Sequence, residues 1–210
     1  MKLFVISESQ IGRVGLEFIV GVPLDDLHFR NAGSRSGAAS LACTILQSSD
    51  AQVAVVFDAP DSADIVSEPD TDDWEPVLAA VAPPSRQLLL RFQSGFERVL
   101  FHDLHNLRQT FANVWSDGYI ERARRDAREA IRELFRAQDR RYDSGALLDL
   151  LERLDLPLLR QDEHIARLVS LVDEFLWQTV NHRTAEVERE LAVSAQLAEQ
   201  AQRLERGEDR

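Results

Sequence analysis

A short apolar run at residues 53–57 (VAVVF) limits the possible folds of this chain more than any other stretch. It contains no polar residue, and Asp58 and an acidic segment with Pro60 follow it directly. A continuous apolar run of this length is typical of a strand that is buried on both faces, as in a parallel sheet covered by helices. We therefore predict a strand at 53–57 that delivers carboxylates at its carboxyl end.

Similar segments on both sides of this run complete an alternating pattern. Residues 2–6 (KLFVI) and 88–92 (LLLRF) are also nearly all apolar, and residues 27–30 form a shorter candidate strand. Helical patterns separate the four candidate strands at residues 10–20, 37–47 and 72–81. Strands that alternate with helices predict an α/β fold with a small parallel sheet and flanking helices.

The pattern changes after this first part of the chain. Beyond residue 103 we find no strand pattern, and helices are predicted at residues 103–115, 118–141, 144–154 and 161–206. We therefore predict an α/β domain at 1–103, followed by an all-helical region at 104–210 that ends in a long helix. The weak apolar periodicity of residues 185–210 suggests pairing with another chain, so we expect a homo-oligomer formed through the helical region.

Composition excludes several classes of protein. The formal net charge of −12 argues against a nonspecific coat on nucleic acid, although acidic metal ligands also contribute to that charge. No run approaches the ~20 apolar residues that a membrane-spanning helix requires, so we expect no membrane partner. Cys43 is the only cysteine, which excludes a disulfide framework and a cysteine-based zinc site. We expect a cytoplasmic protein.

Acidic residues follow three of the predicted strands. Glu8 follows residues 2–6, Asp58 follows 53–57, and Glu97 lies shortly after 88–92. Because parallel strands share one carboxyl edge, these acids can converge in space. Converging carboxylates repel one another unless a divalent cation such as Mg²⁺ or Mn²⁺ neutralises them, and such an ion can activate water. The structural alternatives are a cap or turn role for Asp58 and a first-turn helix acid at Glu97.

These segments resemble the TOPRIM fold of topoisomerases, primases and OLD-family nucleases. The resemblance lies in LFVISES, which carries Glu8, and in VAVVFDAPDSAD, which carries the aspartates. A third segment, SGFERVLFHDL, resembles the serine-and-glutamate segment of OLD-type and defence-associated TOPRIM-like proteins. The resemblance covers about residues 1–103 and implies a magnesium-dependent nuclease, in the setting of bacterial defence. It also implies roles for four acids: Glu8 as general base or metal ligand, Asp58 as a catalytic residue and metal ligand, Asp61 as a metal ligand, and Glu97 as a ligand of a second metal.

The chain also departs from the TOPRIM pattern. Ser9 stands where the family usually has glycine, and Asp58 and Asp61 are separated by two residues that include Pro60. These departures, together with the large helical region, motivate a second hypothesis. In it the chain is a non-catalytic TOPRIM-like subunit that binds a protein partner or self-associates through its helices.

Arginines recur along the predicted helix at 118–141. Steps of three and four residues place them on one helix face, where they can bind the phosphate backbone of a nucleic acid. The residues of this stripe are Arg125, Arg128, Arg132, Arg136 and Arg140. Two alternatives remain: a solvated face neutralised by Glu121, Glu129 and Glu133, and a surface that docks onto an acidic partner.

Overall fold

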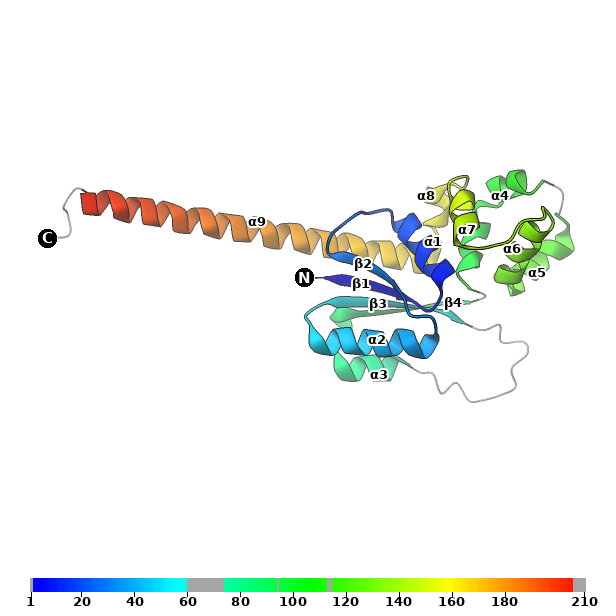
Figure 1. The fold of residues 1–210 in the computed structure, drawn as a ribbon, viewed down its shortest axis with the longest axis horizontal. Helices are drawn as coiled ribbons and strands as arrows, with labels where there is room; N and C mark the ends of the chain where they lie inside the picture. Colours follow the sequence, from blue (N-terminus) through cyan, green and yellow to red (C-terminus); the bar gives the residue numbers. More distant parts are fainter. Residues whose placement is uncertain (1, 60–73, 94, 113–114, 206–210) are drawn as a thin grey trace. The chain divides into compact units, whose positions relative to one another are not determined.

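The structure is a computed structural model that describes residues 2–59, 74–93, 95–112 and 115–205 (Figure 1). The chain forms two compact units, residues 1–169 and 170–210. The first contains a four-stranded parallel sheet with flanking helices. Every described element after the sheet is helical. The predicted α/β class with a helical C-terminal region is therefore confirmed.

The sheet has the strand order β2-β1-β3-β4, and all its pairings are parallel. The strands are β1 (Leu3–Ser7), β2 (Leu27–Asn31), β3 (Gln52–Ala59) and β4 (Gln87–Gln93). The apolar run at 53–57 forms most of β3, an inner strand, which explains why it lacks polar residues. Ser7 lies opposite Val56, and Asp58 lies opposite Phe92. The carboxyl ends of β1, β3 and β4 therefore share one edge of the sheet.

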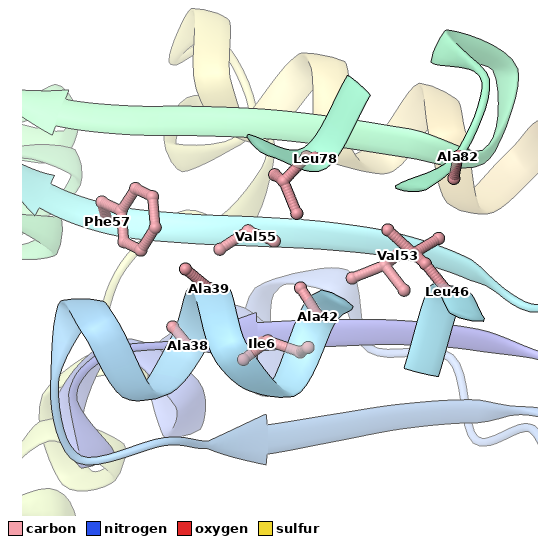
Figure 2. Close-up of a cluster of buried hydrophobic side chains, with 10 residues drawn as sticks. All are labelled: Ile6, Ala38, Ala39, Ala42, Leu46, Val53, Val55, Phe57, Leu78 and Ala82. Carbon is pink, nitrogen blue, oxygen red and sulfur yellow. The ribbon is translucent and has the colours of Figure 1, made fainter. Parts of the chain in front are cut away.

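The crossover helices cover both faces of the sheet. Figure 1 shows α1 (Gln10–Val20) on one face and α2 (Arg35–Ser48) and α3 (Trp74–Val81) on the other. On the α2 face, side chains of alternate strand positions, such as Val53, Val55 and Phe57, pack against the alanines of α2 (Figure 2). The small side chains let α2 lie close to the sheet, and burying each large apolar side chain contributes about 1.5–3 kcal/mol.

Two arginines from distant parts of the chain complete the C-terminal ends of these helices. Arg160 donates hydrogen bonds to the carbonyl oxygen of Ile19, at 2.9 and 2.7 Å, at the end of α1. Arg86, in the short 3₁₀ helix η1 (Pro84–Arg86), donates to the carbonyls of Leu46 and Ala51, at 3.2 and 3.1 Å, around the end of α2. The last carbonyls of a helix have no partner within the helix, so each arginine stabilises an otherwise open end.

The helical part begins with the 3₁₀ helix η2 directly after β4. Its elements are η2 (Phe96–Asp103), α4 (Leu104–Thr110), α5 (Asp117–Arg125), α6 (Ala127–Arg136), α7 (Ser144–Leu151), α8 (Leu156–Leu159) and α9 (Glu163–Glu205). Asp103 links two of them, because its buried carboxylate accepts hydrogen bonds from the Asn106 side chain and from the Asp155 N–H. Burial alone would raise the pKa of Asp103, but these hydrogen bonds outweigh it, and the pKa lies below its ordinary value.

The prediction of one helix at 118–141 is wrong, because the chain breaks at Asp126 between α5 and α6. Asp126 caps both helices. Its backbone N–H donates to the Arg122 carbonyl at the C-terminal end of α5, and its side chain accepts a hydrogen bond from the Glu129 N–H, at 2.9 Å, at the N-terminal end of α6. A short acid favours this capping position because it satisfies an N–H that lacks a helical partner. The predicted arginine stripe is therefore divided between two helices.

Helix α9 begins in the first unit and continues into the second. Within it, the residues from 180 to 195 whose side chains are described are all exposed. They include the large apolar side chains of Val180, Val187, Leu191 and Val193. No helix in the described part of the chain combines the length and apolar character needed to cross a membrane.

Candidate functional site

The turn between β1 and α1 places Glu8 at the carboxyl edge of the sheet. Ser7 is buried and accepts a hydrogen bond from the Ser9 N–H, while the Ser9 side chain caps α1 by accepting from the Gly12 N–H at 3.0 Å. Between the two serines, the Glu8 N–H donates to the Val56 carbonyl at 3.3 Å and so extends the pairing of β1 with β3. The Ser-Glu-Ser sequence therefore fixes the backbone on both sides of the acid.

Arg35 lies beside Glu8, which the sequence did not predict. Its Nε atom is 3.5 Å from Oε2 of Glu8, and the two side chains are 26% and 16% exposed. The guanidinium also lies over the Phe57 ring, 5.8 Å from its centroid. As the first residue of α2, Arg35 reaches the carboxyl edge because α2 begins only three residues (32–34) after the carboxyl end of β2. An acid, a cation and the end of β3 are thus brought together from three elements.

Asp58 lies near the end of β3, the strand that pairs with β1, and Glu8 directly follows β1. The sequence predicted that Glu8 and Asp58 leave the sheet at one shared edge, and the pairing of Ser7 with Val56 shows in addition that β1 and β3 are neighbouring strands. The Asp58 side chain and all of Asp61 lie outside the described residues. Their predicted roles as metal ligands, and the catalytic role of Asp58, therefore stay predictions.

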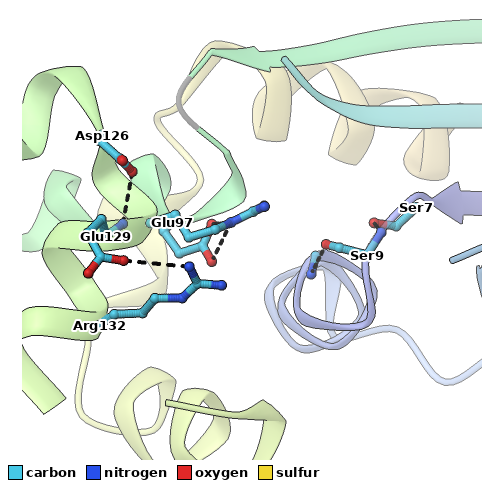
Figure 3. A network of polar contacts seen from close by, with 8 residues as sticks. Ser7, Ser9, Glu97, Asp126, Glu129 and Arg132 are labelled. Carbon is cyan, nitrogen blue, oxygen red and sulfur yellow. Dashed lines mark hydrogen bonds and ion pairs between the residues drawn. The ribbon is translucent and has the colours of Figure 1, made fainter. Parts of the chain in front are cut away.

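Glu97 is buried in η2 and forms an ion pair with Arg128 of α6 (Figure 3). Its side chain is 1% exposed, and the Arg128 Nε atom lies 3.3 and 3.4 Å from its two carboxylate oxygens. Gly95 makes room for the pair: a Cβ atom there would lie 2.8 Å from Glu97 Oε2, and its φ of 85° strongly favours glycine. A metal role for Glu97 requires its carboxylate to be shared with Arg128, and that role also stays a prediction.

Two glycines of α1 bring this helix close to both acids. A Cβ atom at Gly15 would lie 2.1 Å from Cζ of Phe96, the residue before Glu97. A Cβ atom at Gly12 would lie 2.6 Å from the hydroxyl of Ser7, the residue before Glu8. The absence of side chains at these positions lets α1 pack against both β1 and η2, so one helix positions both ends of the candidate site.

The remaining arginines of the predicted stripe lie on α5, on α6 and in the segment after α6. Arg125 ends α5, while Arg132 and Arg136 lie on the outer face of α6. Both α6 arginines contact Glu129, at 3.6 and 3.2 Å, which is the partial neutralisation expected for that acid. Of the four predicted nucleic-acid contacts, Arg128 is therefore paired with the buried Glu97, whereas Arg132 and Arg136 are largely exposed.

The donors at the carboxyl edge have the chemistry that a hard divalent cation prefers. Glu8 supplies carboxylate oxygens there, and Asp58 and Asp61 would supply more. Within the described ranges, no three His, Cys, Asp or Glu side chains gather as metal ligands. A metal centre would therefore depend on the two aspartates, whose side chains are outside those ranges.

No protein-family model, curated protein or solved structure matches this chain. The TOPRIM resemblance therefore rests on the segments around Glu8, Asp58 and Glu97. The physical case for a site rests on the shared strand edge and on the side chains described around it.

Proposed function

We propose that the chain is a divalent-metal-dependent nuclease of TOPRIM type, which cleaves phosphodiester bonds. The observation that carries this proposal is the placement of Glu8 and Asp58 on neighbouring parallel strands, where both leave the sheet at one edge. In open parallel sheets, ligands bind beyond the carboxyl ends of the strands. The ion pair between Glu8 and Arg35 adds a cation that can contact a substrate phosphate.

Each residue of the edge has a role in this proposal. Glu8, oriented by Arg35, accepts a proton from the attacking water. Asp58 and Asp61 hold Mg²⁺ or Mn²⁺, with Glu97 as a ligand of a second ion. When bound, the metal supplies positive charge that polarises the phosphate. Arg132 and Arg136 contact the nucleic-acid backbone without reading its sequence.

Calorimetry with Mn²⁺ and cleavage assays on single- and double-stranded DNA and on RNA test this proposal. Glu8→Gln is expected to abolish cleavage, and Asp58→Asn to abolish cleavage and weaken Mn²⁺ binding at least tenfold, roughly the effect of losing one charged ligand. Asp50→Asn is the matched control, because this exposed carboxylate precedes β3 at the opposite edge. Cleavage that persists in both site variants would refute the proposal.

The exposed apolar side chains of α9 support a second candidate function, self-association without catalysis. Trp177, Val180, Val187 and Leu191 are 68%, 60%, 55% and 64% exposed. Together with Thr184 and Ser194 they recur at alternating steps of three and four residues, the spacing of a two-helix seam. A helix that is exposed on all sides gains little stability from its own packing, and a second helix would cover this seam.

Charge favours an antiparallel second copy as the partner. By sequence, residues 184–194 of the seam carry three glutamates and one arginine, Arg189, whereas residues 177–183 carry one arginine, Arg183, and no acid. Antiparallel pairing places the acidic half of one helix beside the basic half of the other. Parallel pairing in register would place the glutamates beside their own copies, which is unfavourable.

Light scattering across a concentration series tests this second candidate. Val187→Asp is expected to convert a dimer to a monomer, because it places a charge inside the seam. Val193→Asp is the matched control: it lies on the same helix and is similarly exposed, at 54%, but it is off the seam. A wild-type chain that is monomeric at high micromolar concentration would contradict self-association and leave the nuclease proposal untouched.

A further inference from the structure

A second cationic feature lies at the C-terminal end of α6, and the metal chemistry of the sheet edge does not use it. An open pocket of about 310 Å³ is lined by four arginines and one tyrosine: Arg132, Arg136, Arg140, Arg141 and Tyr142. Arg132 and Arg136 come from the last turns of α6, and the other three come from the segment that follows. Arg141 and Tyr142 were not among the predicted site residues.

The packing of α6 explains why its arginines line a pocket. Its buried face consists of Ala127, Ala130, Ile131, Leu134 and Phe135. Arg132 and Arg136 are one turn apart on the opposite face, where their side chains are 52% and 68% exposed. The two guanidinium groups are therefore presented together to solvent.

A tight turn then folds the chain back beside these arginines. Asp139 has a φ of 54°, its N–H donates to the Arg136 carbonyl, and the Arg140 N–H donates to the Phe135 carbonyl. These are the two hydrogen bonds of a Schellman motif, which ends a helix and reverses the chain. The Arg140 guanidinium lies over the Phe135 ring at 5.3 Å, and the Tyr142 ring also packs against Phe135. Phe135 therefore contacts two of the side chains that line the pocket, those of Arg140 and Tyr142.

Every charged side chain that lines the pocket is an arginine. Glu129 is shared by Arg132 and Arg136, and Asp149 contacts Arg140 at 3.2 Å. Arg141 is exposed and forms no ion pair with any residue in the described ranges. Asp139, in the turn itself, is the one further acid between α6 and Tyr142. Of the residues that the structure describes, four arginines and no acid line the pocket, and two of the arginines share the single carboxylate of Glu129.

We propose that this pocket binds phosphate groups of a nucleotide or polynucleotide. Guanidinium groups bind phosphate through paired hydrogen bonds, and several converging on one cavity favour a multiply charged ligand. The pocket volume is at the lower end for ligand sites, which suits a phosphate and the sugar attached to it. Tyr142, which also lines the pocket, contributes an aromatic ring on which a base can stack. The proposal builds on the backbone contact proposed above for Arg132 and Arg136 and extends it to a defined pocket, and it requires no metal at the sheet edge.

Glu129 competes with the phosphate in this arrangement. An incoming phosphate replaces Glu129 as the partner of two arginines: Arg136, which now donates a hydrogen bond to its carboxylate, and Arg132, which forms an ion pair with it at 3.6 Å. Replacing Glu129 by glutamine removes that competing charge, so it is expected to tighten phosphate binding. A purely structural role for these ion pairs predicts the opposite: a less stable protein and no gain in affinity.

The test measures binding in EDTA and low salt by two methods, with a labelled 12-nucleotide single strand in fluorescence anisotropy and with tripolyphosphate in calorimetry. The double variant Arg136→Gln/Arg141→Gln is expected to weaken binding at least about tenfold, and Glu129→Gln to tighten it about threefold. Arg124→Gln is the matched control, because Arg124 is 73% exposed, is paired with Glu121 and lies outside this pocket. Binding is also expected to weaken as salt is raised.

The two ligands distinguish the sources of phosphate. Binding of both supports a general phosphate site, the single strand alone supports a polynucleotide site, and tripolyphosphate alone supports a nucleotide site. No binding of either ligand overturns the proposal, as does an equal loss in Arg124→Gln or an unchanged affinity in the double variant. Asp58→Asn is expected to bind normally, so a failure of the nuclease proposal and a failure of this one can be told apart. Circular dichroism confirms that each variant is folded.

Discussion

The Nε atom of Arg128 lies 3.3 Å from Oε1 of Glu97, a side chain that is only 1% exposed. The two residues are 31 positions apart and join the 3₁₀ helix after β4 to helix α6. A carboxylate taken out of water requires a counter-charge, because its own desolvation is unfavourable. The pair is therefore a structural link between the sheet edge and the helical part of the first unit.

Removing only the cation of this pair is expected to destabilise the protein more than removing both charges. Arg128→Met leaves the buried Glu97 carboxylate without this counter-charge and should lower the free energy of unfolding by about 3 kcal/mol. The double variant Arg128→Met/Glu97→Gln should recover part of that loss, because the buried charge is gone. Urea unfolding measures both values. If the effects of the two substitutions simply add, the pair is not coupled as described.

The close approach of α1 to Phe96 leads to a prediction about two glycines. Gly15→Ala should lower the free energy of unfolding by about 1–3 kcal/mol, because the new methyl group overlaps the Phe96 ring. In Gly118→Ala, the new Cβ atom meets nothing closer than 4.0 Å, and a gain of about 0.5 kcal/mol is expected from the lower entropy of the unfolded chain. Thermal unfolding of both variants measures the contrast. Equal effects of the same sign would be evidence against the overlap.

Asp103 makes stability depend on pH in a defined direction. Its folded-state pKa lies below the ordinary value of 3.8, so the charged form is favoured by folding. The stabilisation is complete above the unfolded-state pKa, near that ordinary value, and is lost as pH falls through the lower folded-state pKa. Asp103→Asn should therefore be less stable than wild type by about 1–3 kcal/mol at pH 7 and differ less at pH 2. Urea titrations at both pH values measure this, and a pH-independent difference would rule it out.

Arg160 is expected to resist conservative replacement. Its guanidinium donates through two nitrogens to the Ile19 carbonyl, and one of them also reaches the Val20 carbonyl. Lysine cannot reproduce this fork, so Arg160→Lys should cost about 1–2 kcal/mol of stability. Arg167→Lys, at an exposed position of α9, is the control and should be nearly neutral. Chemical denaturation measures both, and equal stabilities would contradict a capping role for Arg160.

The sheet could be predicted because each strand has a local sequence signal, a short run of mostly apolar residues. The run at 53–57 has no polar residue, and β3 extends one residue before it and two residues beyond it, through Asp58. Parallel alternation predicted that Glu8 and Asp58 leave the sheet at the same edge, but the strand order that makes β1 and β3 neighbours was not predicted. The break at Asp126 also had a local signal that was not used: an acid followed three residues later by Glu129 is the pattern of a helix start.

The contacts around the site could not be predicted in the same way. Arg35 meets Glu8 across 27 residues, and Arg128 meets Glu97 across 31. No spacing rule within one helix or strand relates such residues. The arginine pocket depends on the turn at Asp139, where a residue other than glycine adopts a left-handed conformation. These features follow from packing, which is decided by the chain as a whole.

The glycines of α1 limit which substitutions this chain can accept during evolution. Packing requires glycine at positions 12 and 15, since a methyl group at Gly12 would displace the Ser7 side chain and one at Gly15 would displace Phe96. That requirement persists whether or not the protein carries out chemistry. Descendants that abandoned catalysis would keep both glycines while their acids at positions 8 and 58 became free to vary. If the nuclease proposal is correct, the residues at positions 8 and 58, and not the glycines, would therefore distinguish catalytically active relatives from inactive ones.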